Sequence, residues 1–143
     1  MKKLSGFVIA ISMFVFTACD KNVPVPVHNS LQGSWHCVEN SINGTRTYLI
    51  DIDPLKADTT QYLISNFQNM NISSDGYNVV FAYAKRTGST LTITPNQSVS
   101  NGTATIIVKS GTGAISNAFK RIDFVYLIFD GRNDITVQAV YTR

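Results

Sequence analysis

Apolar and polar residues alternate with a period of two through most of the chain that follows residue 30. In the last such run, Ile135, Val137, Ala139 and Tyr141 alternate with Asp134, Thr136, Gln138 and Thr142. This period is that of a β-strand, in which successive side chains point to opposite faces of the sheet. The pattern predicts strands over residues 33–40, 45–52, 60–67, 77–86, 90–94, 103–109, 112–117, 119–129 and 134–142.

Short turn signals separate these predicted strands, and each is a glycine that follows a polar residue. They are Asn43-Gly44, Asp75-Gly76, Thr87-Gly88, Asn101-Gly102, Ser110-Gly111 and Asp130-Gly131. Only residues 53–60, which include Pro54, and residues 67–72 leave room for a longer loop or a single helical turn. Eight or nine short strands in this order predict an all-β domain, a single antiparallel up-and-down meander. Closing the meander into a small barrel removes its exposed edges, and an open β-sandwich is the alternative.

The first 18 residues follow a different pattern, a nearly continuous apolar run behind a positive head. Lys2 and Lys3 precede a mainly apolar stretch over residues 4–16, and small residues come directly before Cys19. This order is typical of a secretory signal peptide. The alternative, a transmembrane anchor, requires about 20 apolar residues, whereas this stretch is shorter and is interrupted by polar residues.

Phe16-Thr17-Ala18-Cys19 resembles a bacterial lipobox, in which the cysteine receives a lipid and the signal peptide before it is removed. The resemblance implies a signal peptide over residues 1–18 and attachment to a membrane through the lipid on Cys19. It indicates the cell envelope, at the outer membrane, and leaves the periplasmic or surface face open. The tether that follows, residues 19–30, alternates Val and Pro and favours an extended chain that reaches about 30 Å. Residues 31–143 are long enough for one domain with one core.

Net charge argues against one class of partner. The formal charge of +3 falls to +1 when Lys2 and Lys3 leave with the signal peptide, which contains no acidic residue. The remaining Lys and Arg residues are scattered among Asp and Glu, without the clustered basic face that nucleic-acid binding requires. We therefore expect no nucleic-acid partner.

Metal and cofactor chemistry finds little support in the sequence. His28 and His36 have no third ligand at the spacing of a metal site. Asp51, Asp53 and Asp58 surround a loop and carry the oxygen ligands that calcium prefers. However, an apolar residue interrupts this set, and no glycine-centred loop or terminal Glu completes it. We expect no metal and no cofactor.

Nucleophilic catalysis is equally unsupported. With Cys19 lipidated, Cys37 is the only other cysteine and cannot form an internal disulfide. A single cysteine in an apolar strand is more often a small buried side chain than a reactive group, which requires an open electropositive setting. Ser, His and Asp are all present, but no nucleophile elbow is found among them. We expect that the protein is not an enzyme.

Leu31-Gln32-Gly33-Ser34-Trp35, at the head of the first predicted strand, is similar to the Gly-x-Trp signature of lipocalins and related calycin barrels. The domain also resembles the small lipocalin-like lipoproteins of Bacteroidetes, through residues 62–67, 91–97, 111–113 and 139–143. In lipocalins an arginine stacks on the signature tryptophan. Because closing the barrel pairs the first strand with the last, we expect Trp35 to be buried at one barrel end against Tyr141 or Arg143.

Asp58-Thr59-Thr60 is similar to the short acceptor motif for O-glycosylation in exported Bacteroidetes proteins, which makes Thr59 a candidate glycosylation site. A lipid-anchored barrel of the kind implied by the resemblance is expected to be a monomeric binding module for a small apolar ligand, held in the barrel mouth. The alternative is a structural or interaction lipoprotein whose barrel is filled by its own side chains. Its partner would be an envelope protein or a glycan.

Overall fold

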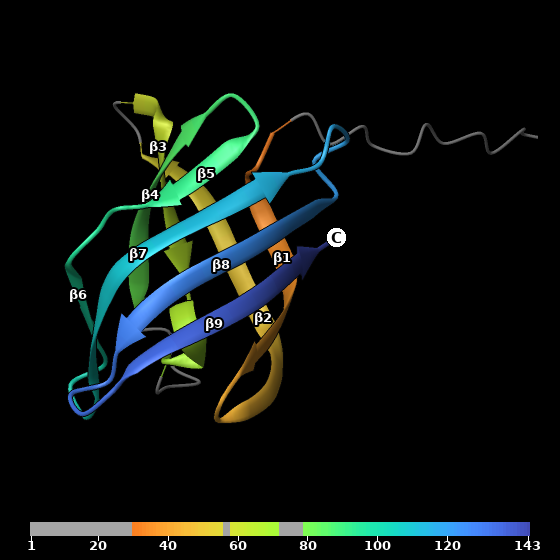
Figure 1. Cartoon of the computed structure of the whole chain (residues 1–143). Coiled ribbons are helices and arrows are strands. Elements are labelled where there is room, and N and C mark those ends of the chain that lie inside the picture. Colours follow the sequence, from red (N-terminus) through yellow and green to blue (C-terminus); the bar gives the residue numbers. More distant parts are fainter. Residues whose placement is uncertain (1–29, 56–57, 72–78) are drawn as a thin grey trace, which may run out of the picture.

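The computed structural model describes residues 30–55, 58–71 and 79–143, and only the backbone of Asp58 and Thr59 (Figure 1). The signal peptide predicted over residues 1–18 lies outside these ranges, as does the predicted tether apart from its last residue. The domain predicted over residues 31–143 begins at the point where the described chain enters its first strand.

The described residues form nine β-strands and one short 3-10 helix (Figure 1). The strands are β1 (Gly33–Ser41), β2 (Gly44–Leu55), β3 (Asp58–Ser65), β4 (Phe81–Thr87), β5 (Thr90–Ile93), β6 (Gln97–Ser100), β7 (Thr105–Ile115), β8 (Arg121–Phe129) and β9 (Asp134–Thr142), and the helix is η1 (Phe67–Asn69). Eight strands pair antiparallel in the order β1-β2-β3-β4-β5-β7-β8-β9, and β9 returns to pair with β1. The predicted meander and its closure into a barrel are confirmed, and the open β-sandwich is excluded.

Two seams close the barrel. At the first, residues 36–40 of β1 pair with residues 138–142 of β9. At the second, residues 90–92 of β5 pair with the later half of β7. Residues 97–100, which are β6, pair with the earlier half of the same β7 edge. Strands β5 and β6 therefore follow one another along β7, and a corner over residues 94–96 separates them.

At this corner a side chain replaces a backbone partner. The Gln97 side-chain amide accepts a hydrogen bond from the Tyr83 backbone N–H (2.8 Å) and donates one to the Tyr83 carbonyl (2.9 Å). The same amide donates to the Thr94 carbonyl (2.8 Å). A side-chain amide carries the donor and acceptor of a peptide group, so it takes the place of a peptide between β4 and β6.

Strand β7 corrects the prediction of two separate strands over residues 103–109 and 112–117. It continues through most of both ranges, with one β-bulge that follows Val108. Gly111 lies within this strand, paired with Tyr126 of β8, and not in a turn. A Cβ atom at this position would be 2.8 Å from Cβ of Tyr126. The glycine makes room for an aromatic side chain inside the barrel, which a turn signal read from the sequence does not reveal.

Three shorter segments, β6, the end of β2 and η1, can also be compared with the predictions. The alternation pattern does not predict β6, in which only Val99 is apolar. Strand β2 includes Pro54, where a loop is predicted, and its pairing with β3 is irregular just after that residue. The helix η1 lies within residues 67–72, where the sequence leaves room for a longer loop or a single helical turn.

Inward-facing side chains of the strands form one buried core inside the barrel. The largest fully buried ones are Trp35, Tyr126, Tyr141, Phe67, Phe124, Leu31, Ile50, Ile52, Ile64, Leu91, Ile93 and Ile122. An eight-stranded barrel has an interior just wide enough for such side chains. Side chains therefore fill the interior, and the barrel ends are the better places for a ligand.

The two ends carry different connections, and we name them upper and lower as Figure 1 draws them. The upper end carries the β2–β3, β4–β5 and β7–β8 connections, the start of β1 and the end of β9. The lower end carries the β1–β2, β6–β7 and β8–β9 connections together with η1. The chain enters the barrel at the upper end, where Ser30 and Leu31 precede β1.

Candidate functional site

The lower end contains the buried polar and charged side chains of the described chain, Glu39 and Gln68. Glu39 is only 1% exposed, although it lies in β1. Arg46 of β2 donates to the Glu39 carboxylate (3.1 Å) and to the Gln68 backbone carbonyl (3.3 Å). The Tyr126 hydroxyl donates to the other Glu39 oxygen, and the Gln68 amide donates to that hydroxyl. Since the same amide accepts from Arg46, the four side chains form a closed ring of hydrogen bonds.

The segment around η1 is fixed across this end. Asn66, Gln68 and Asn69 have φ angles of 55°, 59° and 54°, a left-handed conformation that is uncommon for residues other than glycine. The Asn66 side chain holds this shape, because it donates to the Leu49 carbonyl (2.7 Å) and accepts from the Asn71 N–H (3.1 Å). The turn brings Gln68 into the ring, so the lower end is closed and its buried charge is paired.

Three buried titratable groups, whose pKa values the charge of Glu39 helps to raise, are neutral at pH 7. Burial and the charge of Glu39 raise the pKa of Cys37 to about 12, so its buried thiol stays protonated. Burial likewise raises the pKa of Tyr48 and of Tyr141 above its ordinary value. Among the buried side-chain oxygen and nitrogen atoms of the described ranges, only the Tyr48 hydroxyl has no hydrogen-bond partner. A protonated thiol is a poor nucleophile, so Cys37 is a packing residue.

The upper end brings Trp35 and Arg143 together. The guanidinium carbon of Arg143 lies 4.2 Å from the centre of the Trp35 ring, which is a cation–π geometry. Arg143 also donates to the backbone carbonyls of Phe119 (2.8 Å), Gln32 (2.8 Å) and Ser30. One side chain therefore holds together the end of β9, the loop before β8 and the segment before β1.

Tyr141 belongs to the same end but points into the core. It is fully buried, and its ring centre lies 5.7 Å from that of Phe124. Trp35 is also fully buried, and its ring N–H donates to the Leu31 carbonyl (3.0 Å). Trp35, Tyr141 and Arg143 are thus engaged with the protein itself, and they organise this barrel end.

The remaining candidates from the sequence do not assemble into a site. Cys19 lies outside the described ranges, and so does the side chain of Thr59, whose backbone is in β3. Asp51 accepts a hydrogen bond from the Ser34 hydroxyl on the outer wall. No cluster of His, Cys, Asp and Glu side chains suited to a metal ion occurs in the part of the chain that is described.

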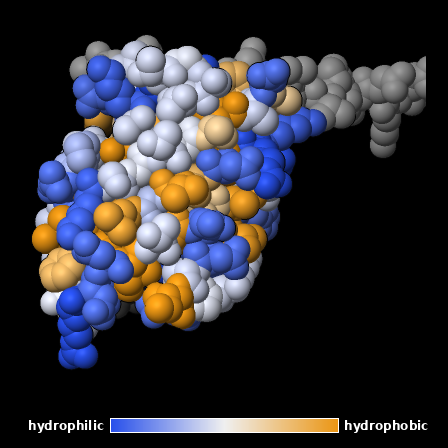
Figure 2. All heavy atoms as spheres, viewed as in Figure 1, coloured by the Kyte–Doolittle hydropathy of each residue, from blue (hydrophilic) through white to orange (hydrophobic). Residues whose placement is uncertain are grey.

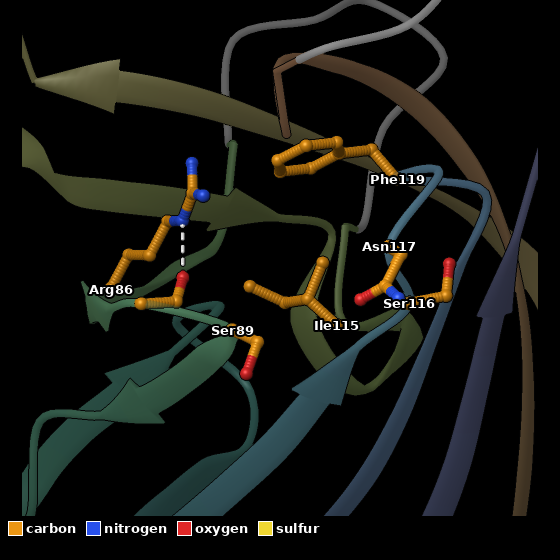
Figure 3. Close-up of a pocket in the computed structure, with 7 residues that line it drawn as sticks. Arg86, Ser89, Ile115, Ser116, Asn117 and Phe119 are labelled. Atoms are coloured by element: carbon orange, nitrogen blue, oxygen red, sulfur yellow. Dashed lines mark hydrogen bonds between the residues drawn. The ribbon is translucent and has the colours of Figure 1, made fainter.

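A hollow of about 310 Å³ opens at the upper end, between the β4–β5 turn and the loop that joins β7 to β8 (Figure 3). Its lining residues are Arg86, Gly88, Ser89, Ile115, Ser116, Asn117 and Phe119. We name this hollow the mouth pocket. Arg86 is the charged residue among the described ones that line it.

The loop over residues 116–120 shapes the mouth pocket. The Ser116 hydroxyl accepts hydrogen bonds from the backbone N–H groups of Lys120 (3.2 Å) and Arg121 (3.1 Å). The Phe119 N–H donates to the Ser116 carbonyl (3.0 Å), and Phe119 has a left-handed φ of 51°. This backbone brings the Phe119 ring towards Arg86 at the rim of the pocket (Figure 3).

Arg86 contacts Phe119 and keeps part of its hydrogen-bonding capacity. Its guanidinium carbon lies 4.8 Å from the centre of the Phe119 ring, and its Nε donates to the Gly88 carbonyl (2.8 Å). No described residue accepts a hydrogen bond from its two terminal nitrogens. Because a guanidinium stacks through its face and donates along its edge, these nitrogens stay available to a ligand. Buried Ile115 adds an apolar surface beside them.

A second hollow, of about 370 Å³, lies on the outer wall beside the β5–β6 corner. Its lining residues are Lys85, Thr87, Thr92, Ile93, Thr94 and Pro95. This hollow is larger than the mouth pocket, but its described lining contains neither an aromatic ring nor a guanidinium group. The mouth pocket therefore offers a ligand the more specific set of contacts.

Neither Arg86 nor Phe119 stands out in the sequence. The alternation pattern places Phe119 in the strand predicted over residues 119–129, whereas it lies in the loop before β8. For Arg86 the only signal is its position next to a turn, which indicates a barrel end. Glu39 has a clearer signal, since it shares the inward face of its strand with Trp35 and is charged.

Comparisons of the chain with protein-family models, with curated proteins and with solved structures found no match. Over the ranges described above, no helix is both long enough and apolar enough to cross a membrane. The closed barrel, the mouth pocket and the sequence motifs are therefore the basis for a functional interpretation.

Proposed function

We propose that this protein is a lipid-anchored, non-enzymatic lipoprotein of the bacterial cell envelope that binds a small apolar ligand in the mouth pocket. The signal sequence, the lipobox residue Cys19 and the extended tether support anchoring at the outer membrane. The resemblance to lipocalin-like lipoproteins of Bacteroidetes supports binding as the role of the barrel. The mouth pocket itself, beside Phe119 and Ile115, is the observation that carries the proposal.

The lining of the mouth pocket suits binding. Phe119 and Ile115 offer apolar area, while Ser89, Ser116 and Asn117 offer hydrogen-bonding groups. Ligand pockets combine these properties, at volumes from about 300 Å³ upward. Among the described residues of the lining there is no His, Cys, Asp or Glu to act as a general base, and we therefore propose binding over catalysis.

A second candidate function is an interaction lipoprotein whose partner is an envelope protein or a glycan. The filled barrel interior favours it, because a filled barrel leaves no internal ligand space. Exposed apolar side chains on the outer wall also favour it: Val125 is 52% exposed and Ile107 38% exposed. Figure 2 shows hydrophobic side chains interspersed with polar ones over the face of β7, β8 and β9.

Fluorescence from the single tryptophan tests the proposal. Every described core residue lies after residue 30, so residues 19–143 with Cys19→Ser keep the described core and can be studied without the lipid. Trp35 is fully buried at the upper end and can transfer excitation energy to the dansyl group of a probe bound at the mouth pocket. We expect saturable energy transfer with dansyl-undecanoic acid at micromolar concentrations.

Two variants locate the binding. Phe119→Asn removes the ring, and asparagine tolerates the left-handed backbone, so this variant should bind about tenfold more weakly. Val125→Thr alters the exposed outer wall of β8 and should bind like the wild type. If the wild type shows no saturable transfer, or if both variants bind like the wild type, the mouth pocket is not the binding site. The interaction lipoprotein would then be favoured.

A further inference from the structure

The mouth pocket lies next to the point where the chain enters the barrel. The Arg143 side chain donates to the carbonyl of Phe119, at the pocket rim, and to the carbonyl of Ser30, the first described residue. Both carbonyls are within reach of one guanidinium group, so the pocket and the root of the tether are neighbours. The mouth pocket and the start of the tether are therefore both at the upper end of the barrel. A lipid on Cys19 would anchor the protein from this same end.

The described side chains around this end carry an excess of positive charge. Arg121 is paired with Asp123 (2.6 Å), so it contributes little net charge. Arg86, Lys120 and Arg143 form no salt bridge with a described carboxylate. Arg143 donates to backbone carbonyls instead, and only Arg86 lines the mouth pocket. The guanidinium of Arg86 is therefore the group that a negative charge would meet inside the pocket.

We propose that the mouth pocket takes an anionic amphiphile, a molecule with a carboxylate or phosphate group at the end of an apolar chain. This inference rests on the proposed function. The anionic group accepts hydrogen bonds from the terminal nitrogens of Arg86, which present the fork geometry that suits carboxylate and phosphate. The first part of the apolar chain lies against Phe119 and Ile115, with the rest directed out of the pocket.

The size and place of the pocket agree with such a ligand. A volume of about 310 Å³ accommodates the anionic group and the beginning of a chain, and not a whole lipid. The Val-Pro sequence predicts an extended tether, and a tether of this kind would keep the barrel within roughly 30 Å of a membrane that holds the lipid on Cys19. Two sources share this chemistry: a free fatty-acid-like amphiphile and the headgroup of an anionic phospholipid.

A charged and a neutral probe test the inference on the same Cys19→Ser chain. Dansyl-undecanoic acid and its methyl ester share the dansyl group and the chain, and the ester replaces the negative charge with one methyl group. We expect the acid to bind about tenfold more tightly than the ester. Arg86→Gln should remove this preference and leave the ester unaffected, and Arg86→Lys should retain part of it. Lys85→Gln is the matched control, because Lys85 precedes Arg86 in β4 and is exposed on the outer wall.

The outcomes separate this inference from the proposed function. Equal binding of acid and ester by the wild type overturns charge recognition and leaves the proposed function in place. Equal loss of acid binding in Arg86→Gln and Lys85→Gln also overturns it, since general surface charge would then explain the preference. If neither probe binds the wild type, the proposed function fails as well.

Vesicles distinguish the two sources. If phosphatidylglycerol vesicles displace the bound acid while phosphatidylcholine vesicles do not, and Arg86→Gln abolishes the difference, the ligand is a lipid headgroup. If neither kind of vesicle displaces the acid while it binds in an Arg86-dependent manner, the ligand is a free amphiphile. Displacement of the acid by both kinds alike, without dependence on Arg86, overturns the inference.

Discussion

The two ends of the barrel each present an arginine from the strand wall, and they use it in opposite ways. At the lower end, Arg46 closes a ring of hydrogen bonds with Glu39, Gln68 and Tyr126. At the upper end, Arg86 contacts an aromatic ring and its terminal nitrogens have no acceptor among the described residues. A barrel filled by its own side chains can thus be sealed at one end and remain open to a ligand at the other.

The largest expected effect on stability is at the upper end. Trp35→Ala removes a fully buried ring and the surface on which Arg143 lies, so it should lower the free energy of unfolding by about 3 to 5 kcal/mol. Urea unfolding followed by circular dichroism measures this loss. Arg143→Met should cost less, about 0.5 to 2 kcal/mol. A greater loss for Arg143→Met would show that the arginine, and not the ring, organises this end.

The lower end is tested by leaving its buried charge unpaired. Arg46→Met keeps much of the side-chain volume but leaves the Glu39 carboxylate without a counter-charge, at an expected cost of about 3 kcal/mol. Adding Glu39→Leu to this variant should recover most of the loss, because no buried charge remains. Urea unfolding of both variants makes the comparison. A double variant as unstable as the single one would indicate that packing of η1, and not charge pairing, seals this end.

Cys37 adds a smaller effect that depends on pH. Its pKa rises from an ordinary value of 9.0 to about 12 in the folded protein, because burial and the charge of Glu39 disfavour the thiolate. Its contribution to stability is complete below pH 9 and is lost as the pH rises towards 12, by at most about 1.4 kcal/mol per pH unit. Cys37→Ala should therefore lose less stability than the wild type between about pH 8 and pH 10.

Urea unfolding of the two proteins at both pH values measures this difference, and the buried tyrosines, present in both, cancel from it. Parallel losses in the wild type and in Cys37→Ala would mean that the thiol ionises as readily in the folded protein as in the unfolded chain. Alkylation gives an independent measurement. The native thiol should react with iodoacetamide only as fast as the protein unfolds, because Cys37 is fully buried.

Much of the fold follows from local patterns. Strand β9 is predicted to the residue, since every second side chain from Ile135 onward is buried. The closure of the barrel follows from the number of strands and the need to cover their edges. By contrast, Gly111 has the local appearance of a turn, and its place in β7 depends on the distant Tyr126. Strand β6 is missed because it is short, mostly polar and paired along one edge only.

The candidate site is less predictable than the fold. Trp35 lies in β1, and Arg143 directly follows β9. These two strands must meet, so the contact can be expected from topology and from the resemblance to lipocalins. The contact between Arg86 and Phe119 requires a loop conformation with a left-handed phenylalanine, which no neighbouring residue type indicates. The ring of hydrogen bonds around Glu39 likewise depends on loop backbone, because the left-handed residues of η1 bring Gln68 into it. Contacts that depend on loop backbone are therefore outside the reach of the alternation pattern.

The side-chain amide of Gln97 has a consequence for the aggregation of this protein. A strand edge with free N–H and C=O groups is a template on which another chain can add a strand, and such growth leads to aggregates. Backbone pairing lapses between β4 and β6, where Phe81 and Tyr83 are 38% and 42% exposed. Here the Gln97 amide already occupies the Tyr83 N–H and shares its carbonyl. The Gln97 side chain thus prevents a second chain from pairing with β4 at this gap in the backbone pairing.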